Sequence, residues 1–297
     1  MKKNKLASEI SNVNYYYSDL LKKHDRVLFM NKIYKQKKDI ERLILVNKNI
    51  NVIHAHTVFS DGGTAYLLYK KFGINYIVNV RNTDINFFYK YAIHLRPFMY
   101  KVLLNARFIV CLSHAYRKRM FSTLPSRIIS QIEDKTLVIP NGIDEYWHER
   151  AQNKGKKIKT SEINLLFIGL IDKNKNLKTV ISSCWQLRKK GMNVRLNIVG
   201  TGPCEDKCKQ LCKNLGIEQN VVFHGYLKDK NSISYIMDNS DILLMPSITE
   251  TFGLVYIEAM SRGLPVVYSQ GQGIDGFFNE GEIGYSVEPL NTKMIVE

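Results

Sequence analysis

Short apolar runs alternate with longer amphipathic segments along most of this chain, a pattern typical of parallel strands that alternate with helices. A first series of such units runs from a strand at 51–54 to a strand at 136–139, and a second series begins at Ile163. A charged stretch without apolar periodicity separates the two series. The pattern therefore predicts an α/β protein with two domains, in which each strand delivers its loop to one edge of a sheet.

The predicted boundaries place the first domain at 1–150, a linker at 151–161 and the second domain at 162–297. A chain of 297 residues is long enough for two domains of ordinary size. Residues 1–50 are basic, rich in tyrosine and only loosely periodic, so no clear strand precedes residue 51. Residues 84–104 have the spacing of a single aromatic helix.

The stretch 241–269 organises the second domain. Its apolar run 242–245 is short and bounded by polar and proline residues, which predicts a buried strand. The apolar positions Leu254, Ile257 and Met260 then follow three apart, as on one face of a helix.

Local signals bound this predicted helix. Thr249 or Thr251 can cap its first turn, and Gly263 with Pro265 supplies the stop signal before a second strand at 264–268.

Two carboxylates belong to the same stretch. Glu250, Phe252 and Gly253 follow the strand, where parallel sheets bind ligands and where the free amides of a helix N-terminus point. Glu258 lies about one helical turn after Leu254, so its side chain leans toward the same place. Carboxylates accept from hydroxyls and amides donate to oxygens, which favours a hydroxyl-rich ligand. The alternative is that the two glutamates only complement the helix dipole and face solvent.

Composition narrows the choice of partner. The formal net charge of +16 predicts an anionic partner, which is a sugar nucleotide, a nucleic acid or an acidic membrane surface. The lysines are spread widely and form no RNP, zinc-finger or helix-turn-helix pattern, which argues against nucleic acid. The aromatic segment 87–100 suits an anionic membrane face, although such stripes more often belong to a core.

The cysteines and the N-terminus bear on localisation. Five cysteines without a Cys-x-x-Cys pair argue against a disulfide framework and a structural zinc site, and they fit a reducing cytoplasm. Cys204, Cys208 and Cys212 recur every four residues, as buried side chains on one helix face do. No apolar run follows the Met-Lys-Lys start and none is long enough to span a membrane. We therefore expect a cytoplasmic protein, with peripheral attachment to the inner face of the membrane as an option.

The block PSITETFGLVYIEAMSRGLPVV, in which seven residues separate Glu250 from Glu258, resembles the donor-site signature of the retaining glycosyltransferases of family 4. The resemblance covers about residues 50–290 and includes PNGID, LLFIGLIDKNKN, LNIVGTGP and VVFHGYL in the order of the family. It implies a GT-B architecture, in which two Rossmann-like doubly wound domains face a cleft. The C-terminal domain would hold the nucleotide-sugar, and the N-terminal domain the acceptor.

The resemblance also implies roles for single residues. Lys175 neutralises the donor diphosphate, Glu250 holds sugar hydroxyls and Glu258 holds the ribose hydroxyls. The implied donor-binding residues are Gly169, Lys175, Gly200, Tyr226, Glu250, Phe252, Gly253, Leu254 and Glu258. The catalytic candidates are Arg81, Asp84, Lys175 and Glu250. No metal and no other cofactor is implied besides the UDP- or GDP-sugar, and no Asp-x-Asp pair is suited to bind a divalent ion between phosphates.

The sequence departs from the family pattern in three places. Leu170 stands where the family has an arginine on the diphosphate, and Lys173 or Arg81 are the candidates for the missing charge. Arg81 itself stands where many members have a histidine, so Arg81 and Asp84 are acceptor-side candidates, with a plain ion pair as the alternative. The first strand and the closing helices of the family are not visible, which suggests truncation at both ends.

The function predicted is transfer of a hexose from a UDP- or GDP-sugar to a hydroxyl of a glycan or lipid-linked acceptor, in surface polysaccharide or glycolipid synthesis. A first alternative is a truncated, inactive remnant that still binds nucleotide-sugars. A second is an NAD-dependent oxidoreductase, for which Gly-Thr-Gly-Pro at 200–203 is only a partial dinucleotide fingerprint.

Overall fold

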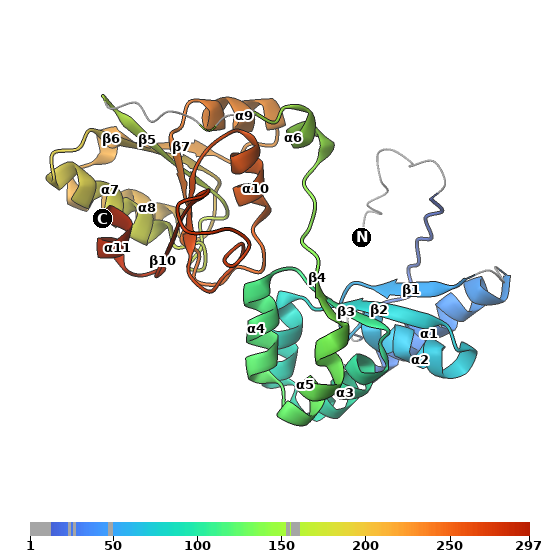
Figure 1. The fold of residues 1–297 in the computed structure, drawn as a ribbon. Helices are drawn as coiled ribbons and strands as arrows, with labels where there is room; N and C mark the ends of the chain where they lie inside the picture. Colours follow the sequence, from blue (N-terminus) through green and yellow to red (C-terminus); the bar gives the residue numbers. More distant parts are fainter. Residues whose placement is uncertain (1–12, 23–24, 26–27, 47–49, 153–154, 156–160) are drawn as a thin grey trace.

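The computed structural model describes residues 13–22, 25, 28–46, 50–152, 155 and 161–297. Two parallel sheets with their own helices and their own hydrophobic cores form two lobes (Figure 1). This arrangement confirms the prediction of two Rossmann-like units. The chain crosses between the lobes at 139–144, ahead of the predicted linker at 151–161. Residues 153–154 and 156–160 of that linker lie outside the described residues.

The first sheet follows the chain in simple order. Its strands pair in parallel as β1-β2-β3-β4. They are β1 (Val52–Ala55), β2 (Asn75–Asn79), β3 (Phe108–Cys111) and β4 (Thr136–Val138). The helices of this lobe are α1 (Phe29–Val46), α2 (Asp61–Phe72), α3 (Arg96–Asn105), α4 (His114–Thr123) and α5 (Ser126–Ile132), with short turns η2 (Asp84–Tyr89), η3 (Ile93–Leu95) and η4 (Glu133–Lys135). Tyr76, Val78 and Ile109 on the central strands are fully buried, so the strands lie between covered faces.

In the second sheet, successive strands are added first on one side of the starting strand and then on its other side. Its order is β10-β9-β8-β5-β6-β7, so β5 pairs with β6 on one side and with β8 on the other. The strands are β5 (Ile163–Ile168), β6 (Val194–Val199), β7 (Val221–Gly225), β8 (Ile242–Leu244), β9 (Val266–Ser269) and β10 (Gly284–Val287). In a parallel sheet, the loops on either side of such a switch point diverge and leave a crevice for a ligand. The loops after β5 and β8 are therefore the expected donor loops.

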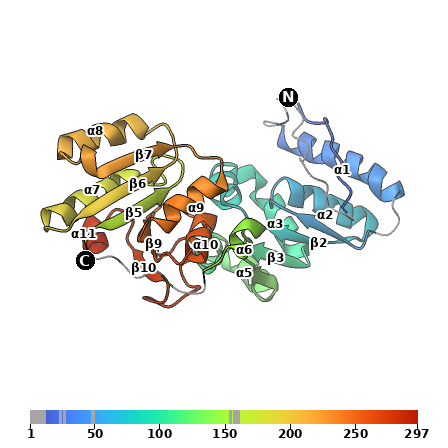
Figure 2. The same ribbon diagram turned by 90° about the horizontal axis from the view of Figure 1, so that it is seen from above.

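The helices of the second lobe are α6 (Glu145–Glu149), α7 (Leu177–Lys189), α8 (Glu205–Leu215), α9 (Lys230–Asp238), α10 (Leu254–Ser261) and α11 (Thr292–Val296), with the short turn η5 (Glu218–Asn220). Helix α6 packs on α10, and its Trp147 is buried in the core of this lobe. The crossing segment is thus attached to the second lobe as soon as it arrives there. Figure 2 shows the two lobes side by side, with α6 and α10 in the middle of the molecule.

The predicted single helix at 84–104 is wrong. The structure has the π-helical turn η2, a break at Ala92 (φ −94°, ψ 60°), the turn η3 and then α3. Pro97 lies in the first turn of α3. Because proline has no N–H and its ring clashes with the preceding turn, a continuous helix cannot run through this position.

The predicted cap of α10 is also wrong. Its N-cap is Gly253 in a left-handed conformation (φ 84°), and neither Thr249 nor Thr251 caps it. Thr249 is tied to Asn174 instead, since its N–H donates to Asn174 Oδ1 (3.0 Å) and its carbonyl accepts from Asn174 Nδ2 (2.9 Å). This long-range pairing fixes the loop after β8 to the loop after β5, and the N-cap of α10 falls at Gly253 instead.

Gly200 serves the packing of the second sheet. It follows β6 with φ +137°, and a Cβ atom at this position would overlap the carbonyl oxygen of Gly169 at the end of β5. Only glycine allows the two strand ends to approach so closely. The sequence placed Gly200 in the donor site, but the structure places it behind Gly169.

We expect Gly200→Ala to lower the free energy of unfolding by about 3 kcal/mol, because neither backbone can yield to the added methyl. The matched control is Gly216→Ala, at a left-handed position (φ +66°) with open space around it. That variant should lose only about 1 kcal/mol, from backbone strain. Chemical denaturation of the two variants measures the difference, and equal losses would contradict this account of Gly200.

Candidate active site

A cavity of about 560 Å³ lies at the carboxyl ends of strands from both sheets. From the first lobe it is lined by residues that follow β2, β3 and β4, and from the second lobe by residues at the ends of β5 and β8 and on α10. The lining residues are Arg81, Asn82, Thr83, Leu112, Asn141, Ile168, Gly169, Lys175, Glu250, Thr251, Phe252, Gly253, Leu254, Val255 and Glu258. The cavity therefore lies at the switch point of the second sheet, and the first lobe lines its other side.

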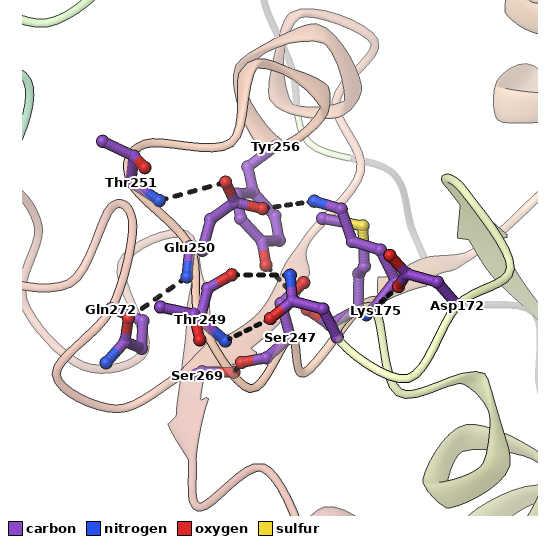
Figure 3. Close-up of polar contacts among 11 residues, drawn as sticks. Asp172, Lys175, Ser247, Thr249, Glu250, Thr251, Tyr256, Ser269 and Gln272 are labelled. Atoms are coloured by element: carbon purple, nitrogen blue, oxygen red, sulfur yellow. Dashed lines mark hydrogen bonds and ion pairs between the residues drawn. The ribbon is translucent and has the colours of Figure 1, made fainter. Parts of the chain in front are cut away.

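An ion pair joins the two donor loops inside this cavity. Lys175 Nζ, from the loop after β5, lies 2.5 Å from Glu250 Oε2, from the loop after β8 (Figure 3). The two side chains are only 23% and 13% exposed. Because little water screens the pair, it holds each side chain in place more firmly than a surface salt bridge would.

Backbone contacts orient both members of the pair (Figure 3). The N–H of Lys175 donates to Asp172 Oδ1 (2.8 Å), which folds the loop after β5 back toward the sheet. The N–H of Glu250 donates to Gln272 Oε1 (3.1 Å), and Glu250 Oε1 accepts from the N–H of Thr251 (3.1 Å). The ammonium group therefore stays at the centre of the cavity wall.

The turn at Gly253 aims the first turn of α10 at the cavity. A Cβ atom at Gly253 would overlap the ring of Tyr256, whose hydroxyl donates to the carbonyl of Met245 (2.6 Å). Burial raises the pKa of Tyr256, so its hydroxyl keeps the proton that this hydrogen bond needs. The first amides of α10 have no acceptor within the helix, and the helix dipole makes this end positive. An anion is the natural occupant of the position in front of Leu254 and Val255.

Glu258 completes this wall one turn along α10. Burial raises the pKa of its carboxyl above the ordinary value, while Lys230 and a hydrogen bond from the Trp147 side chain act in the opposite direction. A half-buried acceptor of this kind gains most from hydrogen-bond donors that a ligand brings.

The first lobe supplies the facing wall. Arg81 Nε donates to the carbonyl of His56 (3.1 Å), and the carbonyl of Arg81 accepts from the hydroxyl of Tyr116 (2.8 Å). Next to the cavity, Ser113 Oγ donates to the carbonyl of Thr251 (2.8 Å), a contact between the two lobes. The donor loop after β8 is thus held from both sides.

Asp84 does not reach the cavity. Its side chain is 1% exposed, and its carboxylate accepts from the N–H groups of Arg81 (2.9 Å) and Phe59 (3.3 Å). Asp84 therefore does not face the cavity as an acceptor-side residue would. It also forms no plain ion pair with Arg81, since it contacts the backbone of Arg81 and not its guanidinium group. Burial raises the pKa of Asp84 to about 6. We assign it the task of positioning the turn that carries Arg81.

The sequence had named eight of the residues that line the cavity. These are Arg81, Gly169, Lys175, Glu250, Phe252, Gly253, Leu254 and Glu258. Gly200 packs behind the site, and Tyr226 is 73% exposed and does not line the cavity. Sequence reasoning missed Asn82, Thr83, Leu112, Asn141, Ile168, Thr251 and Val255. Asn141 could have been found, because it belongs to the PNGID motif after a predicted strand.

Other predicted features are reported for the described residues alone. Within them, no three His, Cys, Asp or Glu side chains are placed to hold a metal ion. The five cysteines are free thiols. Cys208 and Cys212 are buried along α8 as predicted, whereas Cys204 is only partly buried and lies at the N-cap of that helix. None of the described helices is long and apolar enough to cross a membrane.

Comparison with known proteins assigns the family. The family model described as glycosyl transferases group 1 matches residues 149–297, half of the chain, including the donor loops after β5 and β8. This chain belongs to the glycosyl transferases group 1 family. The two sheets facing one cavity accordingly form a GT-B fold.

Individual relatives of this chain agree with the family assignment. An uncharacterized glycosyltransferase of Methanocaldococcus jannaschii is 30% identical over 57% of this chain and 45% of its own length. The alpha-monoglucosyldiacylglycerol synthase of Streptococcus pneumoniae is 26% identical over 73% of this chain and 51% of its own length. The chain thus spans about half the length of these curated relatives. The structure of Anabaena HepE in complex with UDP has a TM-score of 0.69 at 16% identity, covering 86% of this chain and 70% of that one, so it shares the fold.

We expect the stability of this protein to fall as the pH rises from about 4 to about 6, by about 2 to 3 kcal/mol relative to Asp84→Asn. In this range the folded carboxyl of Asp84 still holds its proton, because its pKa is about 6. The unfolded carboxyl, with an ordinary pKa, has already lost it, so rising pH favours unfolding. Denaturation of both proteins across this range measures the difference, and parallel curves would contradict the burial of a titrating Asp84.

Proposed function

We propose that this glycosyltransferase binds a UDP- or GDP-sugar in the cavity at the switch point and transfers its hexose, with retention of configuration, to a hydroxyl of a glycan or lipid-linked acceptor. The observation that carries the proposal is the convergence of Lys175, the N-terminus of α10, Glu250 and Glu258 on one cavity. Two similar proteins support it, since one structure is in complex with UDP and one relative is named an alpha-monoglucosyldiacylglycerol synthase. Surface polysaccharide or glycolipid synthesis is the process we infer.

The diphosphate occupies the space before Lys175 and α10. An ammonium group has three N–H donors, and Lys175 gives one to Glu250, which leaves two for phosphate oxygens. The first-turn amides of α10 donate to the same group. Charge grows on the diphosphate as the sugar leaves, so fixed donors at this place stabilise the transition state more than the bound substrate.

Arg81 is the second cation in this proposal. Leu170, which stands where the family has an arginine, is 55% exposed and carries no charge. Of the two substitutes, Lys173 lines a different cavity, between the loop after β5 and α8, whereas Arg81 lines the same cavity as Lys175. A guanidinium group from the first lobe would then contact the diphosphate once the donor is in place. These cations take the part of a divalent ion, so no cofactor is needed besides the nucleotide-sugar.

The carboxylates hold the sugar and the ribose. Glu250 retains lone pairs beyond those used by Lys175 and Thr251, and these accept from sugar hydroxyls. Glu258 accepts from the ribose hydroxyls one turn along α10. In the reaction, the bond from the anomeric carbon to the phosphate oxygen breaks and the acceptor oxygen bonds to the same face. The leaving phosphate takes the proton of the acceptor hydroxyl, as the family resemblance implies.

The alternatives fit the site less well. An inactive remnant is not favoured, because the lysine and both glutamates still line one cavity. A dinucleotide site at 200–203 is not favoured either, since Cβ atoms at Gly200 and Gly202 would overlap the backbone of Gly169 and Ile171. Those glycines serve chain packing, not the approach of a pyrophosphate. We place the protein in the cytoplasm, where its free cysteines remain reduced.

We expect Lys175→Met to weaken binding of the preferred nucleoside diphosphate, UDP or GDP, about 10- to 100-fold, the effect of losing a charge-assisted hydrogen bond. Its affinity for the bare nucleoside should not change, because the lysine contacts only phosphate. Glu258→Ala should lower the affinity for both ligands by the same factor, because both contain the ribose. Titration calorimetry with the two ligands distinguishes these patterns.

The matched control is Lys173→Met, which removes a neighbouring charge from the other cavity. It should bind both ligands like the wild type. If Lys173→Met lowers diphosphate affinity as much as Lys175→Met does, general attraction by the basic surface explains the binding and the assignment of Lys175 fails.

A further inference from the structure

Three large apolar side chains are exposed on one short segment of the first lobe. Phe87, Tyr91 and Ile93 are 58%, 65% and 61% exposed, and we call these three residues the apolar ridge. The rings of Phe87 and Tyr91 lie 5.7 Å apart, so they form one continuous surface. Single exposed apolar residues are ordinary, but three within seven positions require an explanation.

The same segment is anchored firmly beneath the ridge. Ile85, Tyr89 and Leu95 alternate with the ridge residues and are buried. Arg96 Nε donates to the carbonyl of Tyr89 (2.8 Å), and its guanidinium carbon lies 4.4 Å from the centre of the Tyr89 ring. The ridge is therefore presented outward by a braced backbone. The aromatic stripe predicted at 87–100 divides into a buried part and an exposed part, and only the exposed part is available to a partner.

The charges that accompany the ridge along the chain have a single sign. From Ile85 to Ile132 the chain contains no Asp and no Glu, but it contains eight basic residues. These are Lys90, Arg96, Lys101, Arg107, Arg117, Lys118, Arg119 and Arg127. Lys90 belongs to the ridge segment itself and lies 5.2 Å from the centre of the Tyr91 ring. An exposed apolar surface with a lysine in its own segment, on a chain of net charge +16, favours a partner that is both apolar and anionic.

The ridge is close along the chain to the cavity. Arg81, Asn82 and Thr83 line the cavity, and η2 begins at the next residue. Buried Asp84 holds this junction to the backbone of Phe59 and Arg81. Whatever the ridge contacts is thus held beside the wall that the proposed function assigns to the acceptor.

We propose that the apolar ridge docks on an anionic lipid bilayer. Aromatic side chains favour the boundary between headgroups and acyl chains, and basic residues around them are attracted by anionic headgroups. The ridge inserts while Lys90 and its basic neighbours contact the headgroups, which brings the cavity to the membrane surface. The binding itself stands independently, and only the delivery of a lipid-linked acceptor rests on the proposed function.

The test is sedimentation of the full chain with vesicles of phosphatidylcholine alone or mixed with phosphatidylglycerol. The wild type should bind the mixed vesicles and not the neutral ones. The triple variant Phe87→Ser, Tyr91→Ser and Ile93→Ser should lose at least about tenfold in partitioning, because it removes apolar groups from the interface. Lys90→Glu should weaken binding and reduce its dependence on salt.

The matched control replaces three side chains of similar exposure on the second lobe, Tyr235→Ser, Tyr285→Ser and Leu290→Ser, which are 71%, 62% and 71% exposed in the wild type. This control should bind the mixed vesicles like the wild type. Equal losses in both triple variants, or equal binding of the wild type to both kinds of vesicle, would overturn the proposal. A dimer that only the ridge variant abolishes, in sedimentation velocity without lipid, would assign the ridge to a second copy instead.

Nucleoside diphosphate binding separates the two proposals. The ridge variant should keep wild-type affinity for UDP or GDP, which also shows that it is folded. If the chain binds anionic vesicles but no nucleotide, the proposed function is contradicted and the proposal of membrane docking by the apolar ridge still holds.

Discussion

The cavity that we propose as the donor site depends on the ion pair between Lys175 and Glu250. The pair joins the loops after β5 and β8, which lie on either side of the switch point, and little water screens it. Without the carboxylate, the ammonium group would lose its fixed position at the cavity wall. Without the lysine, a mostly buried carboxylate would lose its only ion-pair partner among the described residues. The pair thus fixes the positions of both side chains before any ligand binds, as the proposed diphosphate site requires.

Glycine and long-range hydrogen bonds allow this pair to form. Gly200 lets the ends of β5 and β6 meet, and Gly253 turns the chain so that α10 starts at the cavity. From the other lobe, Ser113 contacts the carbonyl of Thr251 and buried Asp84 positions Arg81. Residues from both lobes therefore form the cavity, and the two lobes are in contact through the loop after β8.

Much of this could be predicted from the sequence. Strand ends and a change of period from strand to helix place Glu250 and Glu258 correctly, because both are local signals. The burial of Asp84 could not be predicted, since it depends on the amide of Phe59, which is 25 positions away. The choice between Arg81 and Lys173 as the second cation depends on which cavity each residue lines. The break at Ala92 depends on how the chain bends ahead of Pro97. These features depend on tertiary structure, which the periodicity of the sequence does not reveal.

The central claim is that the convergent groups around Lys175 still transfer sugar. The most direct measurement is release or transfer of label by the purified chain from a panel of UDP- and GDP-sugars, with and without anionic vesicles that carry candidate acceptors. The account predicts turnover of at least one donor, with a product that keeps the anomeric configuration of the donor sugar. Tight binding of nucleotide-sugars with no turnover across the whole panel would contradict it.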